Sequence, residues 1–343
     1  PHPANNKLST TDIPVLPHSI MQRTINLQEK PMPDNVKART LIVKYTGTIV
    51  LLSIVSFLIY ANTLQNPFVF DDKPNITENP HIRMRAIAPE QIAQIKKSSS
   101  PRPFSNFTFA LNYYFHQYRV TGYHLINVLI HIINALLIVT IVNLTLRLCR
   151  SRHAFQTALL AGLLWITHPL HTQSVTYIVQ RMTSLATLFY LLSLLCYIRA
   201  RMTSTTDDGL VLKRRGLFLC AGAAWVLGLA SKQIVATLPI VLFLYEWFFF
   251  QDLHTGWLKK QIKWILTAII LLGAIALIYL GDNPVDRTIS GYAKRDFILA
   301  ERLLTQPSIV IYYISLLFFP HPSRLNLDYD FSLSTGLFTP PST

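Results

Sequence analysis

The sequence predicts an all-α polytopic membrane protein. Hydrophobic residues make up 51% of the 343 residues and charged residues only 14%, with a mean hydropathy of +0.34. A soluble domain of this size carries roughly 25% charged residues. The apolar runs reach the length of about 17 to 25 residues that spans the hydrocarbon core. Only helices and closed barrels satisfy their backbone in lipid, and these runs do not alternate, so we expect helices.

The first predicted span follows a polar segment. Residues 1–40 are polar, rich in proline and without a helical period. We expect a cytoplasmic segment that docks on the rest of the chain or on a partner subunit. The membrane domain is expected at residues 41–343, with a first span at 41–62 and a long hydrophilic outer loop at 63–121. The next spans are expected at residues 122–146, 154–168, 175–198, 216–231, 234–250 and 264–281.

The C-terminal part combines a second outer loop, residues 282–307, with an apolar run, residues 308–319. A run of about twelve residues, at about 1.5 Å each, is too short to cross a bilayer. We therefore expect a re-entrant segment, because Glu301, Arg302 and Pro307 argue against a longer helix. The end of the sequence shows no sign of a finished domain, so we expect the chain to be truncated before further sequence.

Basic residues near the helix ends set the orientation. Most of the net charge of +14 lies at one end of the predicted spans, which we assign to the cytoplasm. There it meets anionic lipid headgroups, so the charge does not indicate nucleic-acid binding. The opposite face then receives both outer loops and the turns at residues 168–174 and 231–233. This convergence is the main indication of a functional site.

Asp71 and Asp72 are the sharpest chemical feature. They follow the first span at the lipid–water boundary. A carboxylate at that place can accept a proton from an acceptor hydroxyl and so activate it for glycosyl transfer. The alternative is an Asx-type turn that begins a surface loop.

His168 and His171 lie in a turn too short to leave the membrane surface. They could bind a metal ion, donate to a phosphate, or cap helix ends around Pro169. No neighbouring cysteine or carboxylate completes a metal site, so we predict no metal ligand here.

Several cations on the outer face are candidate ligands of a lipid phosphate or diphosphate. Arg181 lies about two turns inside a predicted apolar helix, where a charge is costly unless it faces a cavity or a partner. Lys232 lies between two spans, and Arg102, Arg287 and Arg324 lie in the predicted outer segments. The alternative is snorkelling to headgroups, which fits Lys232 better than Arg181.

The motifs, taken in order, resemble a known family. Asn66–Asp72 (NPFVFDD) is followed by Gly122–Asn127 (GYHLIN), by His168–Arg181 (HPLHTQSVTYIVQR) and by Ser231 with Lys232. They resemble the GT-C superfamily of membrane glycosyltransferases. The nearest resemblance is to the bacterial O-mannosyltransferase-like proteins whose membrane half precedes tetratricopeptide repeats.

This resemblance implies a GT-C helical bundle with its active site on the outer face, under the first long loop. It implies a polyprenyl-phosphate sugar as donor and a hydroxyl of an exported protein as acceptor. It also implies a bacterial inner membrane with the site on the periplasmic side, and a repeat domain beyond Thr343. The family's catalytic carboxylate carries over onto Asp71 or Asp72.

Together, the residues and the resemblance predict an inverting transfer with Asp71 or Asp72 as general base. We expect no resident cofactor, and the need for a divalent cation is left open. The expected ligands of the donor phosphate are Arg181, Lys232, Arg102 and Arg324. The expected acceptor or sugar side consists of His168, His171 and Gln173.

Two glutamines depart from the family pattern. Many relatives carry Glu where this chain has Gln173, and an acid where it has Gln233. A glutamine can hydrogen-bond a substrate but cannot act as a base. This favours the alternative of a catalytically silent GT-C-fold subunit that serves as a scaffold or assembly partner in a membrane complex. A transporter predicts inverted repeats, and the sequence shows no convincing one.

Overall fold

The computed structural model describes residues 34–95, 102–204, 207–280, 292, 295–326, 331–336 and 339. That part of the chain is built from helices and contains no named strand, which confirms the predicted all-α class. It divides into a unit of residues 1–48 and a unit of residues 49–343. The candidate site and the helices from α3 onward belong to the second unit.

Four helical stretches within the described residues are long and apolar enough to cross a membrane, as the polytopic prediction requires. They are Ile42–Thr63, Val120–Leu148, Ile178–Met202 and Gln233–Phe250. The helices over the chain are α2 (Asp34–Tyr60), α3 (Pro89–Ile95), α4 (Pro103–His116), α5 (Val120–Leu148), α6 (Ala154–Thr167), α7 (His171–Thr176), α8 (Arg181–Met202), α9 (Asp208–Leu229), α10 (Leu238–Tyr245), α11 (Thr255–Leu280) and α13 (Leu299–Phe318).

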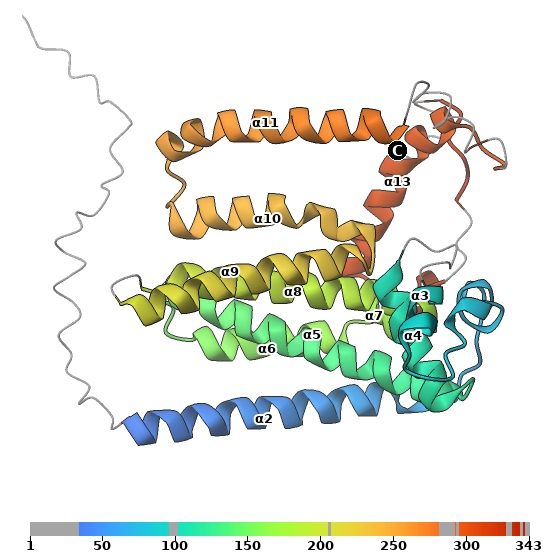
Figure 1. Ribbon diagram of the computed structural model, residues 1–343, viewed down its shortest axis with the longest axis horizontal. Coiled ribbons are helices and arrows are strands. Elements are labelled where there is room, and N and C mark those ends of the chain that lie inside the picture. The colour runs from blue at the N-terminus through green and yellow to red at the C-terminus, as the bar shows by residue number, and fades with distance from the viewer. Residues whose placement is uncertain are drawn as a thin grey trace, which may run out of the picture. The chain divides into compact units, whose positions relative to one another are not determined.

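The centre of the bundle is formed by α5, α6, α8 and α9, which lie side by side (Figure 1). Small and amide side chains allow this close packing. A Cβ on Gly162 of α6 would collide with the side chain of Val139 on α5. Asn134 of α5 donates to the carbonyl of Ser184 on α8 at 3.1 Å, which satisfies a polar group that lipid could not.

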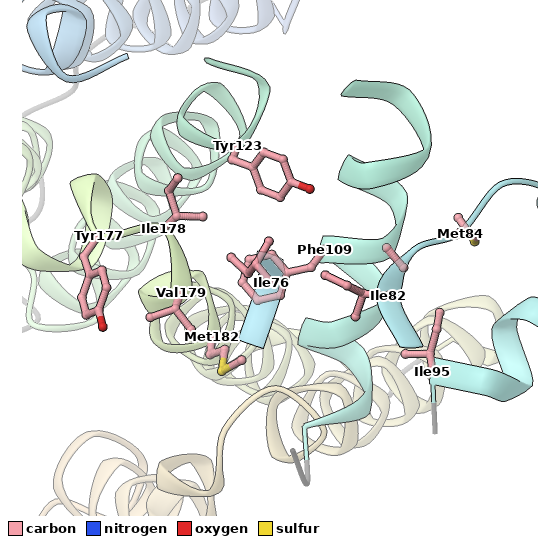
Figure 2. Close-up of a cluster of buried hydrophobic side chains, with 11 residues drawn as sticks. Ile76, Ile82, Met84, Ile95, Phe109, Tyr123, Tyr177, Ile178, Val179 and Met182 are labelled. Atoms are coloured by element: carbon pink, nitrogen blue, oxygen red, sulfur yellow. The ribbon is translucent and has the colours of Figure 1, made fainter. Parts of the chain in front are cut away.

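A separate buried cluster lies under the first outer loop, where the loop, α4, the start of α5 and the segment before α8 meet (Figure 2). Its members are Ile76, Ile82, Met84, Ile95, Phe109, Ala110, Tyr123, Tyr177, Ile178, Val179 and Met182. Because these residues come from four distant parts of the sequence, the cluster fixes the loop against the bundle.

Three predicted boundaries differ from the structure. The polar segment expected to run to residue 40 already turns helical at Asp34, while residues 1–33, with their predicted docking, lie outside the described residues. The span predicted at 154–168 is the 14-residue α6. At about 1.5 Å per residue this helix is about 21 Å long, short of the hydrocarbon core of about 30 Å.

The third difference concerns α13. The loop expected to reach residue 307 ends earlier, because one helix of 20 residues runs from Leu299 through Pro307 to Phe318. Glu301 supports this start rather than opposing it, since its carboxylate accepts the N–H of Ile298 at 2.9 Å. The apolar run predicted as a separate re-entrant segment is therefore the second half of a longer helix.

Candidate functional site

Asp71 and Asp72 occupy opposite environments. Asp72 is fully buried. Its Oδ1 accepts the N–H of Val179 at 2.7 Å, and its Oδ2 accepts the N–H of Val69 at 3.0 Å. Asp71 next to it is exposed. Asp72 therefore ties the first outer loop to the segment before α8, while Asp71 stays accessible to a ligand.

Burial raises the pKa of Asp72 to about 6, from an ordinary value of 3.8. The two backbone N–H groups and the charge of Arg181 oppose this rise, whereas the negative charge of Asp71 adds to it. The Asp72 carboxyl therefore changes protonation state in mildly acidic solution.

Tyr177 positions Asp71. Its hydroxyl accepts the backbone N–H of Asp71 at 2.8 Å, so the loop is fastened at two adjacent residues. Burial, together with the charges of Asp71 and Asp72, raises the pKa of Tyr177. The tyrosine therefore keeps its proton at neutral pH and can donate it to the Asp71 carboxylate beside it.

The later residues of the same segment contact two cations. The Nζ of Lys232 donates to the Thr183 hydroxyl at 2.6 Å and approaches the Gln180 side-chain oxygen at 3.5 Å. The Nη1 of Arg102 lies 2.9 Å from the sulfur of Met182, and its Nε is buried without a hydrogen-bond partner. The Tyr177–Thr183 segment thus contacts the aspartates through its first residues and the two cations through its last ones.

Neither Arg102 nor Lys232 forms an ion pair with any residue that the structure describes. Burial, together with the charge of Arg102, lowers the pKa of Lys232. Two neighbouring cations without a counter-charge attract an anion, and a phosphate with several acceptor oxygens suits both an ammonium and a guanidinium.

An apolar groove of about 240 Å³ is lined by residues that are close to Arg102 and Lys232 in the sequence, among them Pro103 and Ala230. The segments that carry Arg102 and Lys232 also build it, since the N–H of Phe104 donates to the carbonyl of Ala230 at 3.0 Å. Its lining residues are Ile92, Ile95, Pro103, Phe104, Phe107 and Ala230. Cations that can bind a phosphate, next to an apolar groove that can hold a hydrocarbon chain, form the kind of site that a lipid phosphate needs.

Arg181 does not join the cation pair. It is the first residue of α8 rather than lying two turns inside a helix, and it is 0% exposed. Its Nε donates to the Asn127 side chain at 2.7 Å, and its Nη2 donates to the Tyr123 carbonyl at 2.9 Å. Its guanidinium also lies 4.8 Å from the centre of the Phe109 ring. With no exposed atom, Arg181 is not available to a lipid phosphate in this arrangement.

The two histidines belong to a cluster of aromatic rings. The ring centres of His171 and Trp165 lie 4.0 Å apart, with the two rings tilted by 43°. Burial lowers the pKa of His171 to about 3. The Nε2 of His168 donates to the carbonyl of Leu317 on α13 at 3.1 Å. Both histidines are therefore in packing roles here, while Gln173 is exposed.

Arg324 makes its contacts within its own segment. Its Nη2 donates to the Ser315 hydroxyl at 2.5 Å, and its guanidinium lies 4.8 Å from the Tyr312 ring centre. The structure does not bring it to Arg102 or Lys232. Arg287, the other proposed cation, lies outside the described residues.

Comparison with known proteins gives the same relatives repeatedly. Protein O-mannosyl-transferase tmtc2 of Xenopus laevis is 29% identical over 311 residues, covering 82% of this chain and 35% of the frog protein. Protein O-mannosyl-transferase TMTC2 of Homo sapiens is 28% identical over 284 residues, covering 76% of this chain and 32% of the human protein. The chain is similar to these TMTC-type protein O-mannosyl-transferases over three quarters or more of its own length.

This chain spans about a third of the length of these relatives. Protein O-mannosyl-transferase F38B6.6 of Caenorhabditis elegans is 31% identical over 162 residues, covering 45% of this chain and 23% of the worm protein. No family model matches the chain, and no solved structure matches it. The expected bacterial origin stays a prediction, since these relatives come from animals.

Sequence reasoning gave no role to Tyr177, Gln180 or Thr183, although all three stand in or beside the motif that carried the family resemblance. Their polar side chains follow a histidine turn at the predicted membrane surface, which is a usable signal. Nothing in the sequence, however, shows that they contact Asp71 and Lys232, because these two residues are far from them along the chain.

Proposed function

We propose that the chain is a membrane glycosyltransferase that moves mannose from a polyprenyl-phosphate donor to a hydroxyl of an exported protein. One observation carries the proposal: the Tyr177–Thr183 segment holds an exposed carboxylate, Asp71, at its start and contacts Arg102 and Lys232 near its end. The names of the relatives support mannose as the sugar and a protein as the acceptor.

Asp71 is the proposed general base. The acceptor hydroxyl attacks the anomeric carbon of the sugar from the face opposite the phosphate. The bond between that carbon and the phosphate oxygen breaks, and the hydroxyl proton passes to the Asp71 carboxylate. Because attack and departure occur on opposite faces, the anomeric configuration inverts.

Arg102 and Lys232 stabilise the leaving group in this proposal. Negative charge grows on the phosphate oxygen as the bond breaks, and cations that are already in place lower the energy of that state. The first isoprenoid units of the donor would lie in the apolar groove beside Phe104. Asp72 and Tyr177 act as positioning residues, because they hold the loop that presents Asp71.

The proposed site faces the non-cytoplasmic side, since the basic helix ends lie at the other end of the spans. In a bacterium this is the periplasmic side of the inner membrane. Gln173, which is exposed, could still hydrogen-bond the acceptor but takes no proton in this mechanism.

The test uses polyprenyl-phosphate mannose labelled in the sugar and measures label that becomes bound to protein in membranes containing the chain. We expect Asp71→Asn to lower kcat at least about 100-fold, the usual contribution of a general base. Glu78→Gln, an exposed change in the same loop, is the matched control. Arg102→Met should instead raise the KM for the donor.

A folded wild-type protein that neither transfers the label nor releases polyprenyl phosphate would contradict the proposal. That result would favour the scaffold alternative. Equal rates for Asp71→Asn and Glu78→Gln would contradict the assignment of the base alone.

A further inference from the structure

A second hollow, of about 310 Å³, lies in the outer region and takes no part in the proposed transfer step. It is lined by Met84, Arg85, Tyr113, Tyr114 and Gln117. Met84 and Arg85 lie further along the outer loop that carries Asp71, whereas the other three come from the end of α4 and the turn after it.

The hollow is held open by packed side chains beneath it. Met84 is 3% exposed and belongs to the buried cluster, where it lies near Ile82 and Ile95 (Figure 2). Gln117 has a positive φ of 49°, and its carbonyl accepts the Tyr123 hydroxyl at 2.9 Å. The Met84 side chain and the Gln117 backbone are therefore held in place before a ligand binds, which favours affinity.

The lining is mixed rather than apolar. Arg85 is exposed and is the only charged residue of the five, and its guanidinium makes no ion pair with a residue in the described ranges. Tyr114 is 38% exposed beside it. Tyrosine and arginine are the residues that supply most binding energy at protein interfaces, because each joins apolar area to directed hydrogen bonds.

The hollow and the loop that carries the proposed base both pack on the same buried cluster. Phe68 and Val69, just before Asp71, pack on the cluster whose rim includes Met84. Tyr177, which holds Asp71, and Met84 lie at opposite edges of this cluster in Figure 2. The same cluster therefore anchors Met84, which lines the hollow, and Tyr177, which holds Asp71.

We propose that this hollow is a docking site for the acceptor polypeptide, in which an acidic side chain of the acceptor pairs with Arg85 and its backbone lies along Tyr113 and Tyr114. The proposal rests on the proposed function and names its acceptor class. An extended peptide advances about 3.3 Å per residue, so the acidic residue stands several residues from the modified hydroxyl.

A polypeptide fits this site better than a lipid does. The apolar groove beside Arg102 offers the long hydrophobic surface that a lipid needs, whereas this hollow offers two phenol groups, an amide and a guanidinium. Those groups match the carbonyls and carboxylates of a peptide.

The experiment measures binding separately from transfer. Fluorescein-labelled peptides with one threonine, and with glutamate placed at increasing spacing from it, are titrated against the purified protein in nanodiscs by fluorescence anisotropy. The same titration is made with Asp71→Asn protein, which should bind but not transfer. The variants are Arg85→Glu and Tyr114→Ala, and the matched controls are Arg119→Glu and Phe115→Ala, which are exposed nearby but do not line the hollow.

We expect the glutamate peptides to bind, with one preferred spacing, and to bind at least tenfold more weakly to Arg85→Glu than to Arg119→Glu. A peptide with lysine in place of glutamate should bind weakly to the wild type and better to Arg85→Glu. In the transfer assay Arg85→Glu should raise the KM for the peptide and leave kcat unchanged.

Three results would overturn the docking site: no binding of any peptide, equal effects of Arg85→Glu and Arg119→Glu, or binding of a mannose oligosaccharide that Arg85→Glu leaves unchanged while peptides fail to compete. Peptide binding without any sugar transfer would instead count against the proposed function and leave the docking site standing.

Discussion

Replacing Asp72 with asparagine should destabilise the protein most in mildly acidic solution. The amide that takes the place of the carboxylate would keep one acceptor oxygen and turn its NH₂ group toward the second backbone N–H, either that of Val69 or that of Val179. One buried donor then lacks a partner, which costs about 1–3 kcal/mol. This loss does not depend on pH, because an amide does not titrate.

The wild-type carboxyl does titrate. Its contribution to stability falls as pH rises, whereas that of a salt-bridged aspartate increases with pH. Its pKa in the folded protein is about 6, above the ordinary 3.8, so the folded state holds the proton more tightly than the unfolded state. The resulting stabilisation is complete below the unfolded pKa and is lost as pH rises through about 6. At about 1.4 kcal/mol per pH unit, the wild type loses about 1.4 kcal/mol between pH 5 and pH 7.5.

The stability difference between wild type and Asp72→Asn should therefore shrink by about 1.4 kcal/mol over that range. Thermal unfolding of the purified protein in detergent, followed by tryptophan fluorescence at both pH values, measures it. Asp71→Asn, at the exposed neighbour, is the control and should stay within about 0.5 kcal/mol of the wild type. A cost for Asp72→Asn that grows with pH, or that equals the control, would refute the reasoning.

Three further perturbations address other parts of the structure. Donor binding should weaken as pH rises through the lowered pKa of Lys232, whereas Lys232→Arg should bind equally well over the same range, as titration of donor KM against pH would reveal. Arg181→Met should lower the yield of folded protein in size-exclusion chromatography and reduce the free energy of unfolding by about 3–5 kcal/mol. The reason is that it leaves the Asn127 and Tyr123 acceptors buried without a partner. Arg102→Met, at the partly exposed cation pair, is the control and should fold normally. Gly162→Ala should lower the melting temperature by forcing α6 away from Val139. Gly216→Ala, with open space around it, is the control and should raise the free energy of unfolding by up to about 1 kcal/mol. Equal shifts for the two variants would show that packing at Gly162 is not tight.

The sequence predicted the helical bundle well where a helix is uniformly apolar. The span expected at residues 122–146 is the α5 helix, Val120–Leu148, because length and hydropathy alone determine such an element. It failed at α13, where Glu301, Arg302 and Pro307 look like a break. There Glu301 caps the helix start and Arg302 donates to the Tyr292 hydroxyl at 3.0 Å, so both charges have partners.

The candidate site was predictable in residue type but not in environment. Asp71 and Asp72 are adjacent and chemically identical, so local sequence cannot tell which is buried; the N–H of Val179, distant in sequence, decides it. For Arg181, the sequence likewise gives the residue type but not its surroundings. A charge in an apolar stretch suggests a ligand site, but here Asn127 and the Tyr123 carbonyl, both on α5, satisfy it internally.

The Tyr177–Thr183 segment also constrains how such a chain can vary in length. Val179 contacts Asp72 and Thr183 contacts Lys232. The four-residue spacing between Val179 and Thr183 therefore determines that both contacts form at the same time. An inserted or deleted residue there would turn the following helical side chains by about 100° and point Thr183 away from its lysine. Exposed turns tolerate such changes, but this interval does not. Its spacing is therefore the sequence feature that should separate working homologues from chains that keep only the bundle.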